Sequence, residues 1–132
     1  MPMSDLLFVY GALRKGASND WRMKEAVWMG AASVLGTLVK VDWYPGLVLG
    51  GNHSVTGEVY AVGPELLKEL DDFEGIGAEE HNGEYQRINA EVTLGGELTE
   101  VWIYEWLKGI EGYDVVESGD WLSVALQKSG EQ

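Results

Sequence analysis

Apolar residues along this chain recur mostly with the spacing of β-strands. Continuous or alternating apolar runs bounded by turn residues predict strands at residues 6–10, 31–41, 47–49, 55–62, 85–94 and 100–107. The run at 6–10 contains no polar residue, which is typical of a strand buried on both faces. Gly36 predicts a bulge or bend. Glycine and proline predict turns at 44–46, 50–52 and 95–96.

Three other stretches carry helical signals. Polar residues at 18–20 could cap a helix that reaches about residue 29 and ends at Gly30. Pro64 predicts the start of a second helix over 64–74, because proline lacks an N–H group and the first turn of a helix does not need one. A short third helix is expected over 121–127. About six strands with two or three helices predict an α+β fold in one domain, residues 1–132, built on a small curved sheet or closed barrel.

The helix at 64–74 contains the most informative polar residue. Its apolar stripe consists of Leu66, Leu67, Leu70 and Phe73. Glu74 falls inside this stripe, one turn after Leu70, so its carboxylate is predicted to point toward the core. Burial and the negative end of the helix dipole both raise a glutamate pKa, and a general acid/base needs a pKa near neutrality. The alternative is a carboxylate at a solvated helix end.

Two further segments contain candidate binding residues. The loop at residues 10–16 joins a buried strand to the helix expected over 18–29, and its backbone N–H groups could bind a carboxylate or an oxyanion. The alternative is an ordinary turn; Ala17 and Ser18 follow in place of the Lys-Ser/Thr of a nucleotide-binding loop. Arg87, near the start of a strand, could bind a carboxylate of a ligand or form a structural ion pair. Glu79, Glu80 and Glu84 are expected to form a solvated acidic loop edge.

Composition narrows the functional class. The chain has 22 acidic and nine basic residues, a net charge of −13, no cysteine and two histidines. Such a charge disfavours nucleic acids and anionic membranes as partners, and the absence of cysteine removes thiol nucleophiles, disulfides and thiolate metal sites. We expect no metal. There is also no apolar run near the ~20 residues of a membrane span and no signal-like N-terminus, so a cytoplasmic protein is expected.

Several motifs occur in an order that resembles the gamma-glutamylcyclotransferase family, especially its short bacterial members and the gamma-glutamylamine cyclotransferases. They span roughly residues 5–107 and are Phe8-Val9-Tyr10-Gly11-Ala12-Leu13-Arg14-Lys15-Gly16, Tyr44-Pro45-Gly46, Gly57-Glu58-Val59-Tyr60-Ala61-Val62, Leu70-Asp71-Asp72-Phe73-Glu74-Gly75, Tyr85-Gln86-Arg87 and Val101-Trp102-Ile103-Tyr104. The closing Ser118-Gly119-Asp120-Trp121 also looks like the end of some bacterial relatives.

The resemblance implies a small mixed β-barrel of about six to seven strands flanked by two or three helices. It implies an enzyme of acyltransferase or lyase type that converts a gamma-glutamyl amine or amide to 5-oxoproline and a free amine, without a cofactor. Glu74 takes the place of the family's acid/base. The implied substrate-binding residues are Tyr10, Gly11, Ala12, Leu13, Tyr85, Arg87 and Tyr104.

Two departures from the family pattern leave alternatives open. Ala12 stands where many relatives have Ser or Thr, so a hydroxyl contact is lost. The segment at 76–84 is longer and more acidic than in the amine-type enzymes, so their specificity cannot be transferred to this chain. A non-catalytic module that binds a metabolite or a protein on the same fold is the competing hypothesis. The leaving amine and the oligomeric state are not readable from the sequence.

Overall fold

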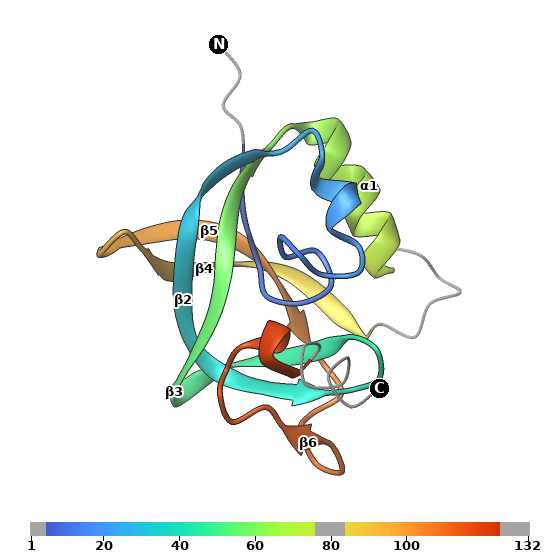
Figure 1. Ribbon diagram of the computed structural model, residues 1–132, viewed down its shortest axis with the longest axis vertical. Helices are drawn as coiled ribbons and strands as arrows, with labels where there is room; N and C mark the ends of the chain where they lie inside the picture. Colours follow the sequence, from blue (N-terminus) through green and yellow to red (C-terminus); the bar gives the residue numbers. More distant parts are fainter. Residues whose placement is uncertain (1–4, 76–83, 125–132) are drawn as a thin grey trace.

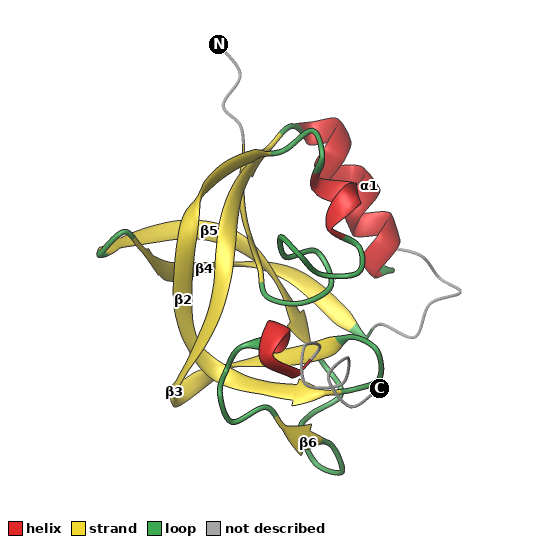
Figure 2. Cartoon of the chain, viewed as in Figure 1, coloured by secondary structure: helices red, strands yellow, loops and turns green. Residues whose placement is uncertain are grey.

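The computed structural model describes residues 5–75 and 84–124. Within these residues the elements are β1 (Asp5–Val9), the 3-10 helix η1 (Asp20–Met23), β2 (Val27–Lys40), β3 (Pro45–Val62), α1 (Pro64–Glu74), β4 (Tyr85–Leu94), β5 (Glu97–Trp106) and β6 (Asp114–Val115). The strands form one six-stranded sheet in the order β3-β1-β5-β4-β2-β6. β3 also pairs with β2, so the sheet curls back on itself, as Figures 1 and 2 show. The fold is therefore α+β, as the sequence predicts.

The sheet is mixed because one of its pairings is parallel. β1 runs antiparallel to β3 and parallel to β5, and the long β2 and β3 form an antiparallel pair along nearly their whole length. β4 and β5 form a hairpin that turns at Gly95 and Gly96, whose φ angles are +60° and +86°. The strand at 85–94, the hairpin turn and helix α1 are thus where the sequence predicts them.

The core consists of two apolar clusters on opposite faces of β1. Phe8 belongs to the cluster inside the curled sheet, while Leu7 and Val9 belong to the cluster beneath α1. Successive side chains of a strand point to opposite faces, so β1 is buried on both, as its continuous apolar run predicts. Leu67 and Leu70 bring the apolar stripe of α1 onto the second cluster. This packing fixes the end of α1 beside the end of β1.

The prediction of a helix over residues 18–29 is wrong. Only Asp20–Met23 is helical, as a 3-10 turn, and β2 already begins at Val27. Trp28 pairs with Tyr60 on β3, and their rings meet edge to face at 5.6 Å between centroids. Gly30, expected to end the helix, instead has a φ of +144° at an irregularity in the β2–β3 register. Pairing with a long neighbouring strand outweighed the local helical signal.

The predicted strands at 47–49 and 55–62 are parts of the single strand β3. The residues at 50–52, expected as a turn, lie in an interruption of the ladder, because Leu35 pairs with Ser54 whereas Gly36 pairs with Leu49. Gly36 does mark a bend: a Cβ there would lie 2.7 Å from the carbonyl oxygen of Val48. The short strand β6 was not predicted. Of the helix predicted over 121–127, residues 121–124 are helical and the rest lies outside the described residues.

Gly57 is expected to tolerate no side chain. A Cβ there would lie 2.2 Å from the carbonyl oxygen of Val9 and 2.6 Å from Cζ of Phe8. Gly57→Ala should therefore lower the free energy of unfolding by about 2–3 kcal/mol, the cost of overpacking a core. Urea unfolding measures this change. Gly63→Ala, where a Cβ would meet nothing within 4 Å, is the control and should cost less than about 1 kcal/mol; equal costs for the two variants would contradict the packing argument.

Candidate active site

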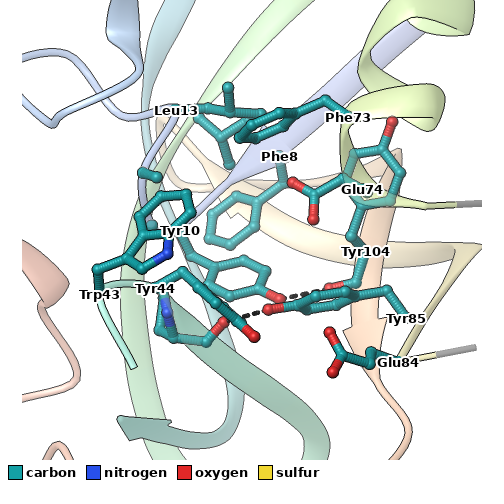
Figure 3. Close-up of a pocket in the computed structure, with 14 residues that line it drawn as sticks. Phe8, Tyr10, Leu13, Trp43, Tyr44, Phe73, Glu74, Glu84, Tyr85 and Tyr104 are labelled. Carbon is teal, nitrogen blue, oxygen red and sulfur yellow. Dashed lines mark hydrogen bonds between the residues drawn. The ribbon is translucent and has the colours of Figure 1, made fainter. Parts of the chain in front are cut away.

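A cavity of about 190 Å³ opens between the end of β1, the end of α1 and the beginnings of β3 and β4. Figure 3 shows its walls, most of which are aromatic. The lining residues are Phe8, Val9, Tyr10, Gly11, Ala12, Leu13, Trp43, Tyr44, Pro45, Phe73, Glu74, Glu84, Tyr85 and Tyr104. Seven of the eight residues predicted from the sequence as catalytic or substrate-binding line this one cavity; only Arg87 does not.

Glu74 is the last residue of α1, and its carboxylate points into the cavity (Figure 3). The helix stops there because Gly75 adopts a left-handed conformation with a φ of +80° and donates its N–H back to the carbonyl of Asp72. Leu70, one turn earlier, is 1% exposed and anchors this part of the helix. Packing of the apolar stripe thus aims Glu74 inward, as its place in that stripe predicts.

The surroundings of Glu74 favour its protonated form. Burial raises its pKa from 4.5 to about 7; the positive charge of Arg22 opposes this rise, and the negative charge of Asp71 adds to it. Arg22 is held nearby, with its guanidinium carbon 4.0 Å from the ring centroid of Phe73 and its Nε donating to Asn19. Near pH 7 the carboxyl group can therefore both accept and donate a proton, as a general acid/base must.

The raised pKa of Glu74 predicts a pH-dependent stability. A folded-state pKa of about 7 lies above the reference value of 4.5, so the folded state binds the proton more tightly and loses stability as pH rises through 7. Relative to Glu74→Gln, the wild type should be equally stable at pH 4 and up to about 3 kcal/mol less stable at pH 8. Urea unfolding at several pH values measures the difference. Glu69→Gln, on the exposed side of α1, should show no such trend; a flat curve for Glu74→Gln would contradict the prediction.

Three tyrosines form a rigid, neutral wall. The hydroxyl of Tyr10 donates to the carbonyl of Tyr104 at 2.5 Å, that of Tyr85 to the carbonyl of Pro45 at 2.6 Å, and that of Tyr104 to Oδ1 of Asp71 at 2.7 Å. Burial is the main cause that raises the pKa of all three hydroxyls well above the ordinary tyrosine value. They remain protonated at neutral pH, so they shape the cavity and do not act as bases.

The loop that follows β1 forms another wall of the cavity. Its turn hydrogen bonds use the carbonyls of Gly11 and Ala12, which accept from the N–H groups of Arg14 and Asn19. Within the described parts of the chain no hydrogen bond uses the N–H groups of Gly11, Ala12 or Leu13, residues that line the cavity, so an anionic or carbonyl oxygen could accept from them. Gly11 has no room for a side chain, since a Cβ would lie 2.6 Å from Pro45.

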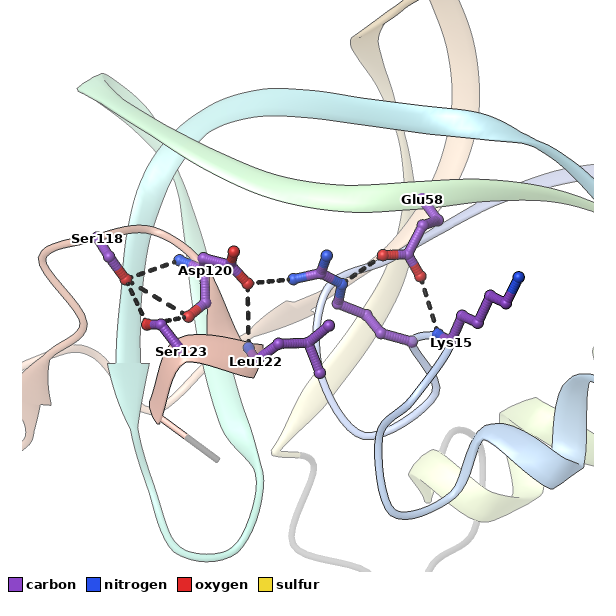
Figure 4. A network of polar contacts seen from close by, with 7 residues as sticks. Lys15, Glu58, Ser118, Asp120, Leu122 and Ser123 are labelled. Carbon is purple, nitrogen blue, oxygen red and sulfur yellow. Dashed lines mark hydrogen bonds and ion pairs between the residues drawn. The ribbon is translucent and has the colours of Figure 1, made fainter. Parts of the chain in front are cut away.

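A buried ionic network, which we call the Arg14 network, anchors this loop (Figure 4). Nε of Arg14 donates to Glu58 on β3 at 2.5 Å, and its terminal nitrogen donates to Asp120 at 2.6 Å. Glu58 also accepts the backbone N–H of Lys15 at 3.0 Å. Arg14 and Glu58 are 6% and 4% exposed. The network therefore joins the loop to the sheet and to the segment near residue 120, a role that the sequence analysis did not assign to Arg14.

Arg87 does not line the cavity. It forms a bidentate ion pair with Asp71, with N···O distances of 2.8 and 3.0 Å, and lies over the ring of Trp102 at 4.2 Å. This is the structural ion pair that the sequence left open as the alternative. Because Asp71 also accepts the hydroxyl of Tyr104, the pair ties α1 to β4 and β5 behind the cavity.

Sequence reasoning missed part of the cavity. Trp43, Tyr44 and Glu84 line it, although Glu84 was expected at a solvated loop edge and Trp43 was not considered. Only the family motif at residues 44–46 pointed to this wall. Glu79, Glu80 and most of the segment at 76–84 lie outside the described residues. No group of three or more metal-ligating side chains occurs in the described parts of the chain, and no helix there is long and apolar enough to cross a membrane.

Comparisons with known proteins find relatives of this chain. The family model described as gamma-glutamyl cyclotransferase, AIG2-like, matches residues 7–123. The gamma-glutamylcyclotransferase family protein YtfP of Escherichia coli K12 is 36% identical over 117 residues, 88% of this chain and 95% of that protein. The gamma-L-glutamyl-butirosin B gamma-glutamyl cyclotransferase of Niallia circulans is 37% identical over 124 residues, 92% of this chain and 78% of that protein.

Solved structures show the same likeness. An AIG2-like protein from Mus musculus superimposes with a TM-score of 0.73 and 27% identity, covering 85% of this chain and 83% of the mouse chain. An uncharacterised protein from Pyrococcus horikoshii superimposes with a TM-score of 0.74 and 25% identity over 96% of this chain and 98% of its own.

Proposed function

Because the chain belongs to the gamma-glutamyl cyclotransferase, AIG2-like family, we propose that it converts a gamma-glutamyl amine or amide to 5-oxoproline and a free amine, with Glu74 as acid/base. The observation that carries the proposal is a carboxyl group with a pKa of about 7, aimed into an aromatic cavity beside a loop with backbone N–H donors. The curled sheet, which we infer to be a small barrel because β3 pairs with both β1 and β2, forms a rigid wall behind the site.

The proposed reaction is an intramolecular aminolysis. The carboxylate of Glu74 takes a proton from the substrate's α-ammonium group, and the freed nitrogen attacks the γ-carbonyl carbon, forming the C–N bond of the ring. Protonated Glu74 then gives that proton to the nitrogen of the original amide, whose C–N bond breaks as the carbonyl re-forms. The ring nitrogen loses its second proton to the departing amine, so the products are 5-oxoproline and an ammonium ion. No water is consumed and Glu74 ends as it began.

The cavity meets the other demands of this chemistry. Attack requires the α-nitrogen to lie close to the γ-carbonyl, so the glutamyl chain must be held folded, and walls fixed by hydrogen bonds favour one such pose. The N–H groups of the loop Gly11–Leu13 are suited to hold the oxygen that becomes negatively charged. Backbone donors do not depend on side-chain identity, so Ala12 removes a hydroxyl without removing them. The relative from Niallia circulans, whose name specifies gamma-L-glutamyl-butirosin B, supports a gamma-glutamyl substrate for this chain.

Release of 5-oxoproline tests the proposal. The purified protein is incubated with a panel of gamma-glutamyl amines and gamma-glutamyl dipeptides, and 5-oxoproline is measured by chromatography. We expect release from at least one member. The competing hypothesis is a non-catalytic module, and it is motivated by Ala12 and the acidic segment at 76–84. Calorimetry with the same compounds tests this hypothesis. Binding without release of 5-oxoproline would favour the module and would overturn the enzymatic proposal.

A further inference from the structure

One wall of the cavity is both aromatic and acidic. Trp43 and Tyr44 lie together, with ring centroids 5.1 Å apart at 78°, and the carboxylate of Glu84 lies close to Tyr44. In Figure 3 Trp43 and Tyr44 lie next to each other, and Glu84 lies next to Tyr85. The side chain of Trp43 is 52% exposed, although a tryptophan is among the side chains that most favour burial. This region, which we call the outer wall, leaves an aromatic face available to a ligand.

The described ionisable side chains near the outer wall are acidic or tyrosine, and none of them is basic. Of the described residues that line the cavity, two are carboxylates, Glu74 and Glu84, and none is Lys, Arg or His. Burial raises the pKa of Tyr44, and the carboxylates of Glu84 and Asp42 raise it further, which places both charges close to that ring. A ligand group at this wall therefore meets negative charge that no lysine or arginine of the lining offsets.

The arginines nearest to the site are already engaged. Arg87 is paired with Asp71, and Arg22 donates to Asn19 and lies close to the rings of Trp21 and Phe73, at 4.4 and 4.0 Å from their centroids. Neither lines the cavity. A carboxylate on the leaving group would thus find no arginine partner among the described residues of the cavity and would face Glu84.

The position of Glu74 determines which part of a substrate meets the outer wall. No lysine, arginine or histidine of the described residues forms an ion pair with its carboxylate, which is directed into the cavity. On the proposed function, the scissile amide lies beside Glu74 and the glutamyl group lies against the loop Gly11–Leu13. The leaving amine then extends toward Trp43, Tyr44 and Glu84.

We propose that the site selects gamma-glutamyl derivatives of amines that carry a second, positively charged group, which lies against Trp43 and Tyr44 and pairs with Glu84. This inference rests on the proposed function and specifies its substrate class. A cation over an aromatic ring is stabilised by the ring quadrupole, most strongly by tryptophan, and a carboxylate at the rim of the same site adds an ionic attraction. A neutral group gains neither, and an anionic group is repelled.

Three substrates of nearly equal length test the inference. They are the mono-gamma-glutamyl amides of 1,4-diaminobutane, of pentylamine and of 4-aminobutyric acid, whose distal groups are an ammonium, a methyl and a carboxylate. We expect kcat/KM for 5-oxoproline release to be roughly 5- to 30-fold higher for the ammonium than for the methyl compound. The carboxylate compound should be the slowest. The preference should shrink in 0.5 M NaCl, because salt screens an ionic contact at the rim of a site.

Variants assign the preference to the outer wall. Glu84→Gln and Trp43→Leu should each reduce the ratio between the ammonium and methyl compounds to about 2-fold or less, chiefly through KM. Glu97→Gln removes the same charge at the exposed β4–β5 hairpin and should leave the ratio unchanged. Equal rates for the three substrates, or a faster carboxylate compound, would overturn this inference while leaving the enzymatic proposal intact. No release from any of the three would overturn this inference, whereas the enzymatic proposal falls only if the gamma-glutamyl dipeptides of the wider panel also release no 5-oxoproline.

Discussion

Replacing Glu74 by glutamine is expected to lower kcat for 5-oxoproline release by roughly 100- to 10,000-fold, the usual contribution of a general acid/base. The amide has nearly the same shape as the carboxyl group, so the cavity should keep its form. It cannot accept a proton from the α-ammonium group or give one to the leaving nitrogen, so both proton transfers are lost. Steady-state kinetics with the best substrate of the panel measures the effect.

The expected loss is in kcat and much less in KM, because the same cavity walls still hold the glutamyl group. Glu69→Gln makes the same chemical change on the exposed side of α1 and should retain wild-type turnover. The higher stability expected of Glu74→Gln at pH 8 shows independently that this variant is folded. A kcat within about threefold of the wild type would remove Glu74 from the catalytic role.

Removing the acidic partner of Arg14 is expected to have the largest effect on stability. Glu58→Ala leaves the guanidinium of Arg14, now 6% exposed, with only Asp120 as an ionic partner. Breaking one side of a buried ion pair typically costs about 3–5 kcal/mol, and we expect a loss of that size in the free energy of unfolding. Urea unfolding at neutral pH measures it.

An exposed ion pair in the same protein provides the control. Lys68 and Asp72 lie one turn apart on α1, with an N···O distance of 3.9 Å and both side chains largely exposed. Asp72→Ala should cost less than about 0.5 kcal/mol, because water and salt screen such a pair. Similar costs for the two variants would mean that the Arg14 network contributes no more than surface charge.

Sequence patterns predicted the structure correctly where the information lies within a single helix, strand or turn. The apolar stripe of α1 located both the helix and the inward direction of Glu74, and Gly95 and Gly96 located the β4–β5 hairpin. The continuous apolar run of β1 indicated burial on both faces. In each case the periodicity of a single segment carries the information.

Local patterns were insufficient where partners far along the chain decide the structure. Residues 27–29 lie between cap residues at 18–20 and Gly30 that predict a helix, but they form a strand because they pair with β3. β3 continues across its glycine-rich interruption because β2 pairs with both of its halves. The partners of Arg14 lie 44 and 106 residues away, so no local window could reveal them. The sequence allowed Arg87 either a ligand contact or an ion pair, and only the position of Asp71 in the fold favours the ion pair.

The same reasoning explains which site residues were missed. Trp43 and Glu84 belong to segments without a regular apolar pattern, and they reach the cavity only because β3 and β4 begin beside the end of α1. Family resemblance identified Glu74 and six other residues that line the cavity. It did not identify Trp43 and Glu84, because neither belongs to the residues that the family motifs mark as substrate-binding.

The pH dependence of kcat/KM between pH 5 and 8 tests the role of Glu74 most directly, because this ratio reports the ionisation of the free enzyme. We expect kcat/KM of the wild type to rise with pH and to reach half of its plateau at about pH 7, the pKa of Glu74. The residual activity of Glu74→Gln should lack this rise. A wild-type profile that is flat from pH 5.5 upward, or the same rise in Glu74→Gln, would contradict Glu74 as the acid/base.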